Sequence, residues 1–260
     1  PIEVVNIKDP TLWAIDIRIA PVEGEYTLLK KRASAFHGTE LAGILRANDV
    51  DTILVTGVTA CACVRQTICD GLAEALEWAN CVVIGPGLGQ DDWAKQLFIW
   101  ALDAAVPCLV DADGLNLLAK QSLHRVDWIL TPHPGEAARL LACSVAEVEV
   151  DRISAARQIQ ARYGGVCVLK GAGTVIAGEE QQLSICCAGN PGMASGGMGD
   201  VLSGIIGGLL AQLSERYSLF EIACLAVNIH GQAADLAAKQ GERGMLASDL
   251  MPYIRQRVNP

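Results

Sequence analysis

A single carboxylate stands in the most glycine-rich part of the chain. The stretch GNPGMASGGMGDVLSGIIGG spans residues 189–208, and Asp200 is its only charged residue. Glycine is entropically costly to order, so such a run indicates a tight backbone path or the close approach of a ligand. An apolar segment at helical spacing follows. We therefore expect a glycine loop leading into a buried helix, whose free N–H groups and dipole attract anions. The alternative is a flexible loop before a closely packed core helix.

Four further loops carry polar groups or glycines where short apolar runs end. GPGLG at 85–89 suits the approach of backbone to a ligand, and Asp111 and Asp113 in DADGLN could meet a metal-bound phosphate or a hydroxyl. Alternatively, one of these aspartates caps the next helix. His133 lies between two prolines in TPHPGEAARLL, where it is either catalytic or structural. KGAGT at 170–174 offers a cation, two glycines and a hydroxyl for a nucleotide phosphate, or forms a tight hairpin turn.

These loops need a scaffold that brings them together. The apolar runs predict strands at 52–58, 81–87, 107–113, 128–134 and 166–173. Helical patterns cover 63–78, 92–105, 135–141 and 148–163, and they continue from residue 217 onward. Alternating strands and helices, with strands that are almost wholly apolar, are typical of a parallel sheet covered on both faces. We therefore predict a three-layer α/β/α fold with a mostly parallel sheet, which binds its ligands at the carboxyl ends of the strands.

The composition limits the partners of the protein. The 260 residues carry a net charge of −9, which argues against nucleic acid as a partner. Ten scattered cysteines show no zinc spacing, so we expect no metal site of that kind and a reducing, cytoplasmic location. There is no signal-peptide pattern, and the apolar segment at 201–213 is too short to span a membrane. Because the chain begins at Pro1 rather than Met, we expect a processed or trimmed chain.

From VVIGPGLG to GMLASDL, the motifs resemble those of the ADP-dependent NAD(P)H-hydrate dehydratases, ribokinase-like enzymes that repair hydrated nicotinamide cofactors. The resemblance covers about residues 73–260, and TPHPGEAARLL, KGAGT and GMASGGMGDVLSGIIG are its most specific phrases. It implies that the adenine nucleotide lies along Lys170, Gly171, Ala172, Gly173, Thr174 and Gly199. It also implies that Gly87 or a neighbour, His133 and Asp200 contact the hydrated nicotinamide. Bacterial members are oligomers, so the resemblance implies a homo-oligomer.

The same resemblance implies a reaction. Asp200 would accept the proton of the C6 hydroxyl of the substrate, which would attack the β-phosphate of ADP. The glycine loop would close its amides around the transferring phosphoryl group. Phosphate would then leave with electrons from the ring nitrogen and restore NAD(P)H. ADP is the expected donor, and Mg²⁺ is a further candidate cofactor.

The first 72 residues resemble a different family. The text GEYTLLKKRASAFHGTELAGILR, followed by GVTACACV, is similar to the isochorismatase-like cysteine hydrolases. By motif, Cys63 matches their nucleophile and Lys30 its activating lysine. These enzymes also need an aspartate on their first strand. Asp16 is the only candidate, and it stands in a different context. A cysteine nucleophile without its activating partner is expected to be inactive.

The chain therefore resembles a joining of two α/β proteins near residue 72. We predict that 1–72 adds strands and helices to the sheet of 73–260, because neither part has all the strands of its family. The leading functional hypothesis is the ADP-dependent dehydratase. The alternatives are a cysteine hydrolase that uses Cys63 and Lys30, and a nucleotide-binding protein without activity.

Overall fold

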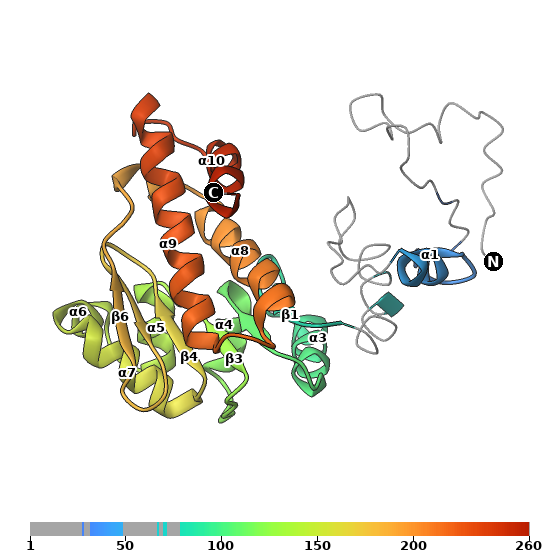
Figure 1. Ribbon diagram of the computed structural model, residues 1–260. Coiled ribbons are helices and arrows are strands. Elements are labelled where there is room, and N and C mark those ends of the chain that lie inside the picture. Colours follow the sequence, from blue (N-terminus) through green and yellow to red (C-terminus); the bar gives the residue numbers. More distant parts are fainter. Residues whose placement is uncertain (1–27, 29–31, 49–66, 68–69, 72–78, 260) are drawn as a thin grey trace. The chain divides into compact units, whose positions relative to one another are not determined.

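A six-stranded sheet is the centre of the larger of two units in this computed structural model (Figure 1). The structure describes residues 28, 32–48, 67, 70–71 and 79–259. Residues 79–259 belong to the larger unit, and the described residues up to 71 belong to the smaller one. Each unit is considered by itself.

The strands of the larger unit follow one another across the sheet in chain order. They are β1 (Val82–Ile84), β2 (Cys108–Val110), β3 (Trp128–Leu130), β4 (Val166–Leu169), β5 (Thr174–Ala177) and β6 (Leu183–Cys186). From β1 to β4 the neighbours are parallel, whereas β4–β5 and β5–β6 pair antiparallel. The carboxyl ends of β1 to β4 therefore lie along one edge of the sheet.

Alternate residues of the central strands enter two different cores. In β2, Leu109 packs in a cluster with helices α8 and α9, whereas Cys108 and Val110 face the helices of the opposite layer. In β3, Ile129 and Trp128 divide in the same way. Strands buried on both faces must be apolar at every position, which explains their continuous apolar sequences.

One layer consists of helices that begin at side-chain caps. Its members are α3 (Asp92–Asp103), α4 (Ala112–Leu118), α5 (Pro134–Leu141), α6 (Val145–Val150) and α7 (Arg152–Tyr163). The carboxylates of Asp91 and Asp151 accept hydrogen bonds from the first turns of α3 and α7, and Ser144 forms a capping box with Glu147. Such caps satisfy N–H groups that the helix leaves unpaired and so fix where each helix begins.

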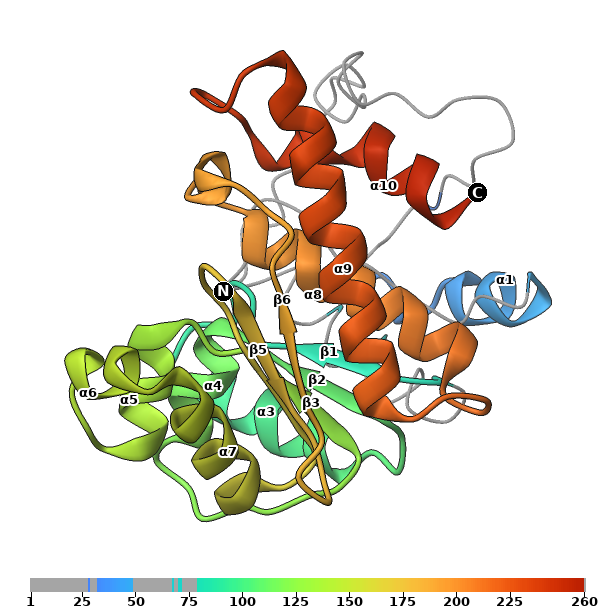
Figure 2. The same ribbon diagram turned by 60° about the vertical axis from the view of Figure 1, so that its left-hand side comes forward.

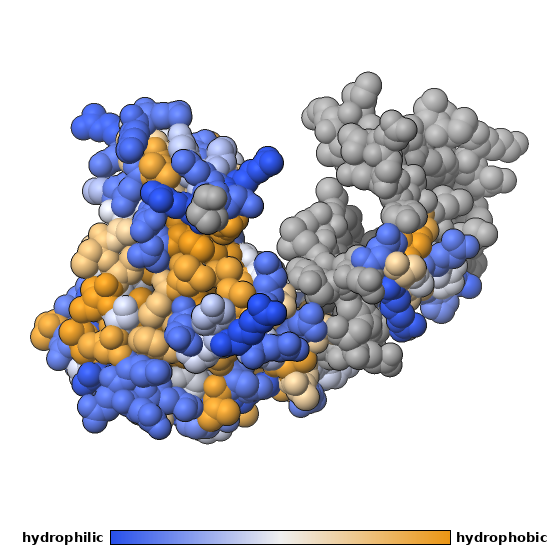
Figure 3. All heavy atoms as spheres, in the orientation of Figure 1, coloured by the Kyte–Doolittle hydropathy of each residue, from blue (hydrophilic) through white to orange (hydrophobic). Residues whose placement is uncertain are grey.

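The other layer consists of α8 (Met198–Leu213) and α9 (Leu219–Ala237), as Figures 1 and 2 show. Helix α8 lies directly on the sheet, since a Cβ atom at Gly207 would meet Cγ2 of Val83 in β1 at 2.6 Å. On the face where α9 lies, hydrophobic residues gather over the middle and hydrophilic ones surround them (Figure 3). Helix α10 (Met251–Val258) follows, and its Tyr253 and Ile254 pack against a cluster with Ala234 of α9.

In the smaller unit, the described residues include helix α1 (Leu41–Ala47). The segment before it is tied to residue 67, because the backbone N–H of Ala35 donates to Oγ1 of Thr67 at 2.9 Å. None of the helices in the described ranges has the length and apolar character that a membrane span requires.

The predicted fold class is confirmed, with corrections to its elements. The helix expected at 148–163 is two helices, because Asp151 caps a new one by accepting a hydrogen bond from the Ser154 N–H at 2.9 Å. Strands β5 and β6 were not predicted, and helix α4 was expected only under the capping alternative for Asp111 and Asp113. The strand expected at 52–58 and most of the helix at 63–78 lie outside the described residues. That residues 1–72 share the sheet of 73–260 therefore stays a prediction.

Candidate active site

The glycine-rich stretch leads into the N-terminus of α8, as the sequence predicts. Gly197 is the N-cap residue with φ +86°, and no side chain caps the helix there. Gly199 and the exposed Asp200 lie in the first turn. Long helices α3, α7 and α9 close their first turns with Asp91, Asp151 and Ser218. The first N–H groups of α8 therefore remain available to an anion.

The loop before α8 is held by hydrogen bonds rather than hanging free. Asp235 of α9 accepts from the backbone N–H of Gly189 at 3.0 Å and from the Asn190 side chain at 3.1 Å. Asn190 in turn accepts from the N–H of Gly192 at 3.0 Å. Gly231 lies one turn earlier on α9, and a Cβ atom there would be 2.8 Å from the carbonyl oxygen of Ala188. The loop thus follows the surface of α9, which argues against the flexible-loop alternative.

A buried group of charges lies beneath the first turn of α8. We call Lys170, Asp111, Ser203 and Glu136 the Lys170 cluster. The Lys170 ammonium is 2.6 Å from Oδ1 of Asp111 and 3.9 Å from Oε2 of Glu136. The Ser203 hydroxyl donates to Oδ2 of Asp111 at 2.7 Å. Asp111 is 2% exposed and Lys170 20% exposed at the side chain. Charges so deeply buried are tolerated because each one has a partner.

Gly199 connects this cluster to the helix terminus. A Cβ atom at Gly199 would be 3.4 Å from Nζ of Lys170 and 3.7 Å from Oδ2 of Asp111. The ammonium thus lies directly against the backbone that carries the free N–H groups of α8. An anion at this terminus would experience both the helix dipole and a fixed cation.

His133 is the N-cap residue of α5, at the end of β3. Its Nδ1 accepts from the N–H of Gly135 at 3.0 Å, and Glu136 accepts from the backbone N–H of His133 at 2.8 Å. Because Nδ1 is an acceptor, the proton of the neutral ring is on Nε2, which lies 3.4 Å from Oε1 of Glu136. Glu136 thus joins His133 to the Lys170 cluster. The side chain of His133 is 52% exposed and open to a ligand.

The KGAGT segment is the hairpin turn between β4 and β5, so the structural alternative at this position is confirmed. Gly171 and Gly173 have φ values of +148° and +69°, which explains the two glycines. The Thr174 hydroxyl donates to the carbonyl oxygen of Gly171 at 3.1 Å, and Gly171 and Ala172 are exposed. A tight turn and a ligand loop are compatible roles for these residues.

The loop after β1 lies against the start of α4. A Cβ atom at Gly85, where φ is +126°, would be 1.7 Å from the carbonyl oxygen of Asp111. The N–H of Gly89 donates to Asp113 at 2.9 Å. Gly87 between them has φ +65° and is exposed. Asp111 is also the N-cap of α4, since its carboxylate accepts from the N–H of Ala112, so the capping alternative holds for this residue.

Three buried side-chain atoms in the described ranges lack a hydrogen-bond partner: Nε of Arg152, Oγ of Ser195 and Nε2 of His230. Arg152 lies against Gly171, and Ser195 is part of the glycine loop. Burial lowers the pKa of His230 to about 4, with a further lowering by the charge of Lys170 and a smaller, opposing effect of a hydrogen bond to the Met198 backbone. Buried polar atoms without partners are rare in folded proteins. Here Ser195 belongs to the glycine loop, Arg152 lies against the KGAGT turn, and His230 belongs to α9, which holds the glycine loop.

The comparison with known protein families agrees with this arrangement. The family model described as NAD(P)H-hydrate dehydratase matches residues 41–256. The chain belongs to this family. The match begins at residue 41, within the segment that resembles the cysteine hydrolases.

Individual relatives carry corresponding names. The bifunctional NAD(P)H-hydrate repair enzyme Nnr of Coxiella burnetii is 55% identical over 76% of this chain and 40% of its own length. The ADP-dependent (S)-NAD(P)H-hydrate dehydratase of Neisseria meningitidis is 39% identical over 73% of this chain and 67% of its own. The chain therefore spans about 40% of the first of these relatives.

A solved structure shares the fold. The ADP/ATP-dependent NAD(P)H-hydrate dehydratase of Bacillus subtilis, crystallised with ATP and Mg²⁺ and soaked with CoA, superposes with a TM-score of 0.63. It is 32% identical, and the match covers 69% of this chain and 65% of that one.

Of the family residues expected from the sequence, Lys170, Gly199 and His133 are connected in the structure through Asp111 and Glu136. Gly87 lies in a loop that touches the same α4 terminus through Gly85 and Gly89. Sequence reasoning missed Glu136, Ser203, Arg152 and His230. Glu136 had a detectable signal, because a glutamate three residues after an N-cap is the capping-box spacing.

The alternative cysteine site is not described by the structure. Cys63 and Lys30 lie outside the described residues. Elsewhere, burial raises the pKa of Cys108 to about 12 and raises that of Cys167 as well, so these thiols stay protonated. A protonated, buried thiol is a poor nucleophile.

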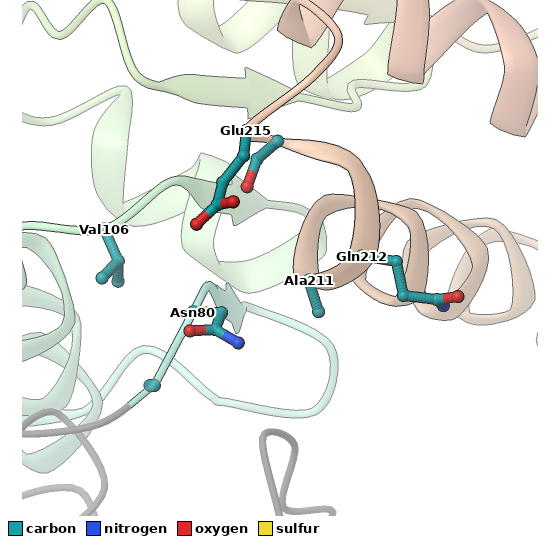
Figure 4. A pocket seen from close by; sticks show the side chains of 7 residues that line it. Asn80, Val106, Ala211, Gln212 and Glu215 are labelled. Atoms are coloured by element: carbon teal, nitrogen blue, oxygen red, sulfur yellow. The ribbon is translucent and has the colours of Figure 1, made fainter.

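A cavity of 330 Å³ lies away from these loops (Figure 4). Asn80 and Val106 line it just before β1 and β2, and Ala211, Gln212 and Glu215 line it near the end of α8. It is therefore at the amino ends of the strands. Ligands of open α/β sheets bind at the opposite edge, where the loops described above meet.

Proposed function

We propose that this chain dehydrates hydrated NAD(P)H with ADP as the phosphoryl donor. Support comes from the family to which it belongs and from the name of the Neisseria relative, an ADP-dependent dehydratase. The comparisons do not support the cysteine hydrolase alternative. We further propose, from the sequence resemblance, that the protein is a homo-oligomer. A cytoplasmic location is proposed because none of the described cysteines is in a disulfide.

One observation carries the proposal. Asp200 is exposed in the first turn of α8, next to Gly199, whose backbone lies against the Lys170 ammonium. A carboxylate, free helix N–H groups and a partly buried cation thus meet within one helical turn. A phosphoryl transfer needs a base for the attacking hydroxyl and electrostatic stabilisation of the transferring group. This turn offers both.

In the proposed reaction, Asp200 accepts the proton of the C6 hydroxyl as its oxygen attacks the β-phosphorus of ADP. The bond from that phosphorus to the bridging oxygen breaks, and AMP leaves. Electrons of the ring nitrogen then expel phosphate from C6 to give an iminium ion, and loss of a proton from C5 to water forms the C5=C6 double bond and restores the dihydronicotinamide ring. The nucleotide is needed because phosphate is a far better leaving group than hydroxide.

The residues present suit a nucleotide. The orphaned Oγ of Ser195 lies in the glycine loop, and exposed Gly171 and Ala172 can approach a flat base or a phosphate without side-chain obstruction. We include Mg²⁺ as an ion that would come with the phosphates and lower their charge. Within the described residues, no group of three His, Cys, Asp or Glu side chains could hold a metal. Mg²⁺ bound mainly by phosphates and water does not need such a group.

The test is Asp200→Asn, which keeps the shape of the side chain but cannot accept the proton. We expect kcat for dehydration of hydrated NADH to fall about 10²- to 10⁴-fold. ADP affinity should hold or rise slightly, because a negative charge leaves the phosphate site. Asp92→Asn is the matched control, since Asp92 is an exposed acidic residue in the first turn of α3.

Near-normal activity of Asp200→Asn would refute the role of this residue as a base, because Asn is also a good residue near a helix start. If the unaltered chain binds ADP but does not turn over, the alternative of an inactive nucleotide-binding protein is supported instead. Lys170→Ala and Gly199→Val should then weaken ADP binding. Alkylation of Cys63 by iodoacetamide should leave dehydration unchanged. A hydrolase activity that is lost on this alkylation would favour the cysteine hydrolase.

A further inference from the structure

Arg152, the first residue of α7, reaches the carboxyl end of β4. Its Nη2 donates to the carbonyl oxygens of Leu169 and Lys170, both at 3.2 Å. Its Nη1 donates to Oε1 of Glu149 at 3.0 Å. The side chain is 16% exposed. One guanidinium thus binds the carbonyl groups of the last residue of β4 and of the first residue of the KGAGT turn.

The turn itself rests against this guanidinium. A Cβ atom at Gly171 would be 2.7 Å from both Nη1 and Nη2 of Arg152. Moving the guanidinium aside would break the hydrogen bonds of Nη2 to the two carbonyls and that of Nη1 to Glu149. Gly171 also has φ +148°, which side chains rarely adopt. The glycine and the arginine are therefore complementary, and each restricts the choice of residue at the other position.

Lys170 is consequently fixed at three points. Its N–H donates to the carbonyl oxygen of Pro132 at 2.8 Å, its carbonyl accepts from Arg152, and its ammonium pairs with Asp111. The exposed turn that follows thus starts from a peptide unit whose position and orientation are set. A preorganised loop loses less entropy when it binds a ligand.

One nitrogen of the Arg152 side chain is unfavourable for stability. Its Nε is buried without a partner, and an unsatisfied buried N–H is destabilising. The two hydrogen bonds from the charged guanidinium to carbonyl groups offset this effect, because hydrogen bonds that involve a charged group are among the stronger ones. We propose that Arg152 is a positioning residue for the nucleotide loop: it sets the affinity for ADP and does not take part in the chemical step. This inference rests on the proposed function.

The experiment measures ADP binding by calorimetry, KM for ADP and kcat at saturating ADP, together with the melting temperature. The variants of the full chain are Arg152→Lys and Arg152→Gln. A lysine keeps the charge but cannot hold two carbonyls in one plane. We expect both variants to bind ADP about tenfold to a hundredfold more weakly with kcat within about twofold. Arg157→Lys is the matched control, an exposed arginine on the same helix.

A double-mutant cycle with Gly171→Ala tests the contact directly. In the native background, the new methyl group would displace the guanidinium and weaken ADP binding. In the Arg152→Gln background, the factor by which Gly171→Ala weakens ADP binding should be at least threefold smaller, because the effects of substitutions at contacting residues are not additive. A residue that only stabilises α7 would give additive effects.

The outcomes separate this inference from the proposed function. If the unaltered chain binds no ADP, the proposed function fails and the inference falls with it. If it binds ADP and the Arg152 variants bind equally well, or lose kcat rather than affinity, only the inference is overturned. If Arg152→Gln does not fold, Arg152→Lys decides. Failure of both to fold would make Arg152 a purely structural residue and would also overturn the inference.

Discussion

Replacing Asp111 by Asn tests the role of the buried ion pair. The carboxylate accepts from Lys170 at 2.6 Å, from Ser203 at 2.7 Å and from the N–H of Ala112 at 2.9 Å. An amide of the same shape has one oxygen instead of two and carries no charge. The ammonium of Lys170 would then lose its nearest counter-ion while 20% exposed.

The magnitude follows from what remains around the ammonium. Removing one partner of a buried ion pair costs about 3–5 kcal/mol, because the other charge stays buried. Glu136 remains 3.9 Å away, and Lys170 has partial access to water, so the lower end applies. We expect a loss of about 3 kcal/mol in the free energy of unfolding. For a chain of this size, the melting temperature would then fall by about 6–12 °C.

The assay is thermal and urea denaturation of the full chain at neutral pH. Asp113→Asn is the control, two residues away at the start of the same helix, and should cost less than about 1 kcal/mol. Combining Asp111→Asn with Lys170→Met removes the uncompensated charge. The double variant should therefore lose less stability than the sum of the single changes. A loss below about 1 kcal/mol for Asp111→Asn, or additive effects in the double variant, would refute the reasoning.

Two further predictions concern His230 and the loop after β1. The folded pKa of His230, about 4, is below its ordinary value of 6.5, so the unfolded chain binds the proton more tightly. Its contribution of about 3 kcal/mol is complete above pH 6.5 and is lost as the pH falls to about 4. Between these pH values, the free energy of unfolding should therefore fall less steeply with decreasing pH in His230→Gln, and the difference in slope should correspond to about one bound proton. An unchanged slope would contradict the burial argument. Gly85→Ala should cost about 3 kcal/mol or more, because its Cβ would meet the carbonyl oxygen of Asp111 at 1.7 Å. Gly87→Ala, which has free space around it, should cost only about 1–2 kcal/mol for its φ of +65°, and equal losses in the two variants would count against the steric explanation.

The sequence predicts the part of the fold that depends on burial. Strands β2 to β4 are buried runs bounded by loops, β1 is an apolar run at the edge of the sheet, and α3 and α5 begin within a residue of the expected positions. Strands β5 and β6 were missed because they follow a turn that was read mainly as a ligand motif, and because β6 is partly exposed and so lacks a buried apolar run. The break at Asp151 was missed because the apolar spacing continues across it, although an aspartate is a common N-cap.

The candidate site was predicted at the level of loops but not of contacts. Lys170 was expected to face phosphate, and the structure shows that its ammonium already pairs with Asp111, 59 residues earlier. The Ser203 hydroxyl that supports this carboxylate is 92 residues away from it. Spacing in the sequence cannot predict such pairs, because they depend on which strand ends become neighbours. That order is a property of the folded sheet.

The contact between Gly207 and β1 has a mechanical consequence. Helix α8 cannot slide or turn toward the sheet without driving Val83 into its own backbone, and the Cys81 thiol donates to the carbonyl oxygen of Gly207 at 3.4 Å. The uncapped N-terminus of the helix is therefore held at a set height above the strands. If the proposed nucleotide binds there, any closure around it would have to come from the loops near this terminus, because the helix itself is fixed against the sheet.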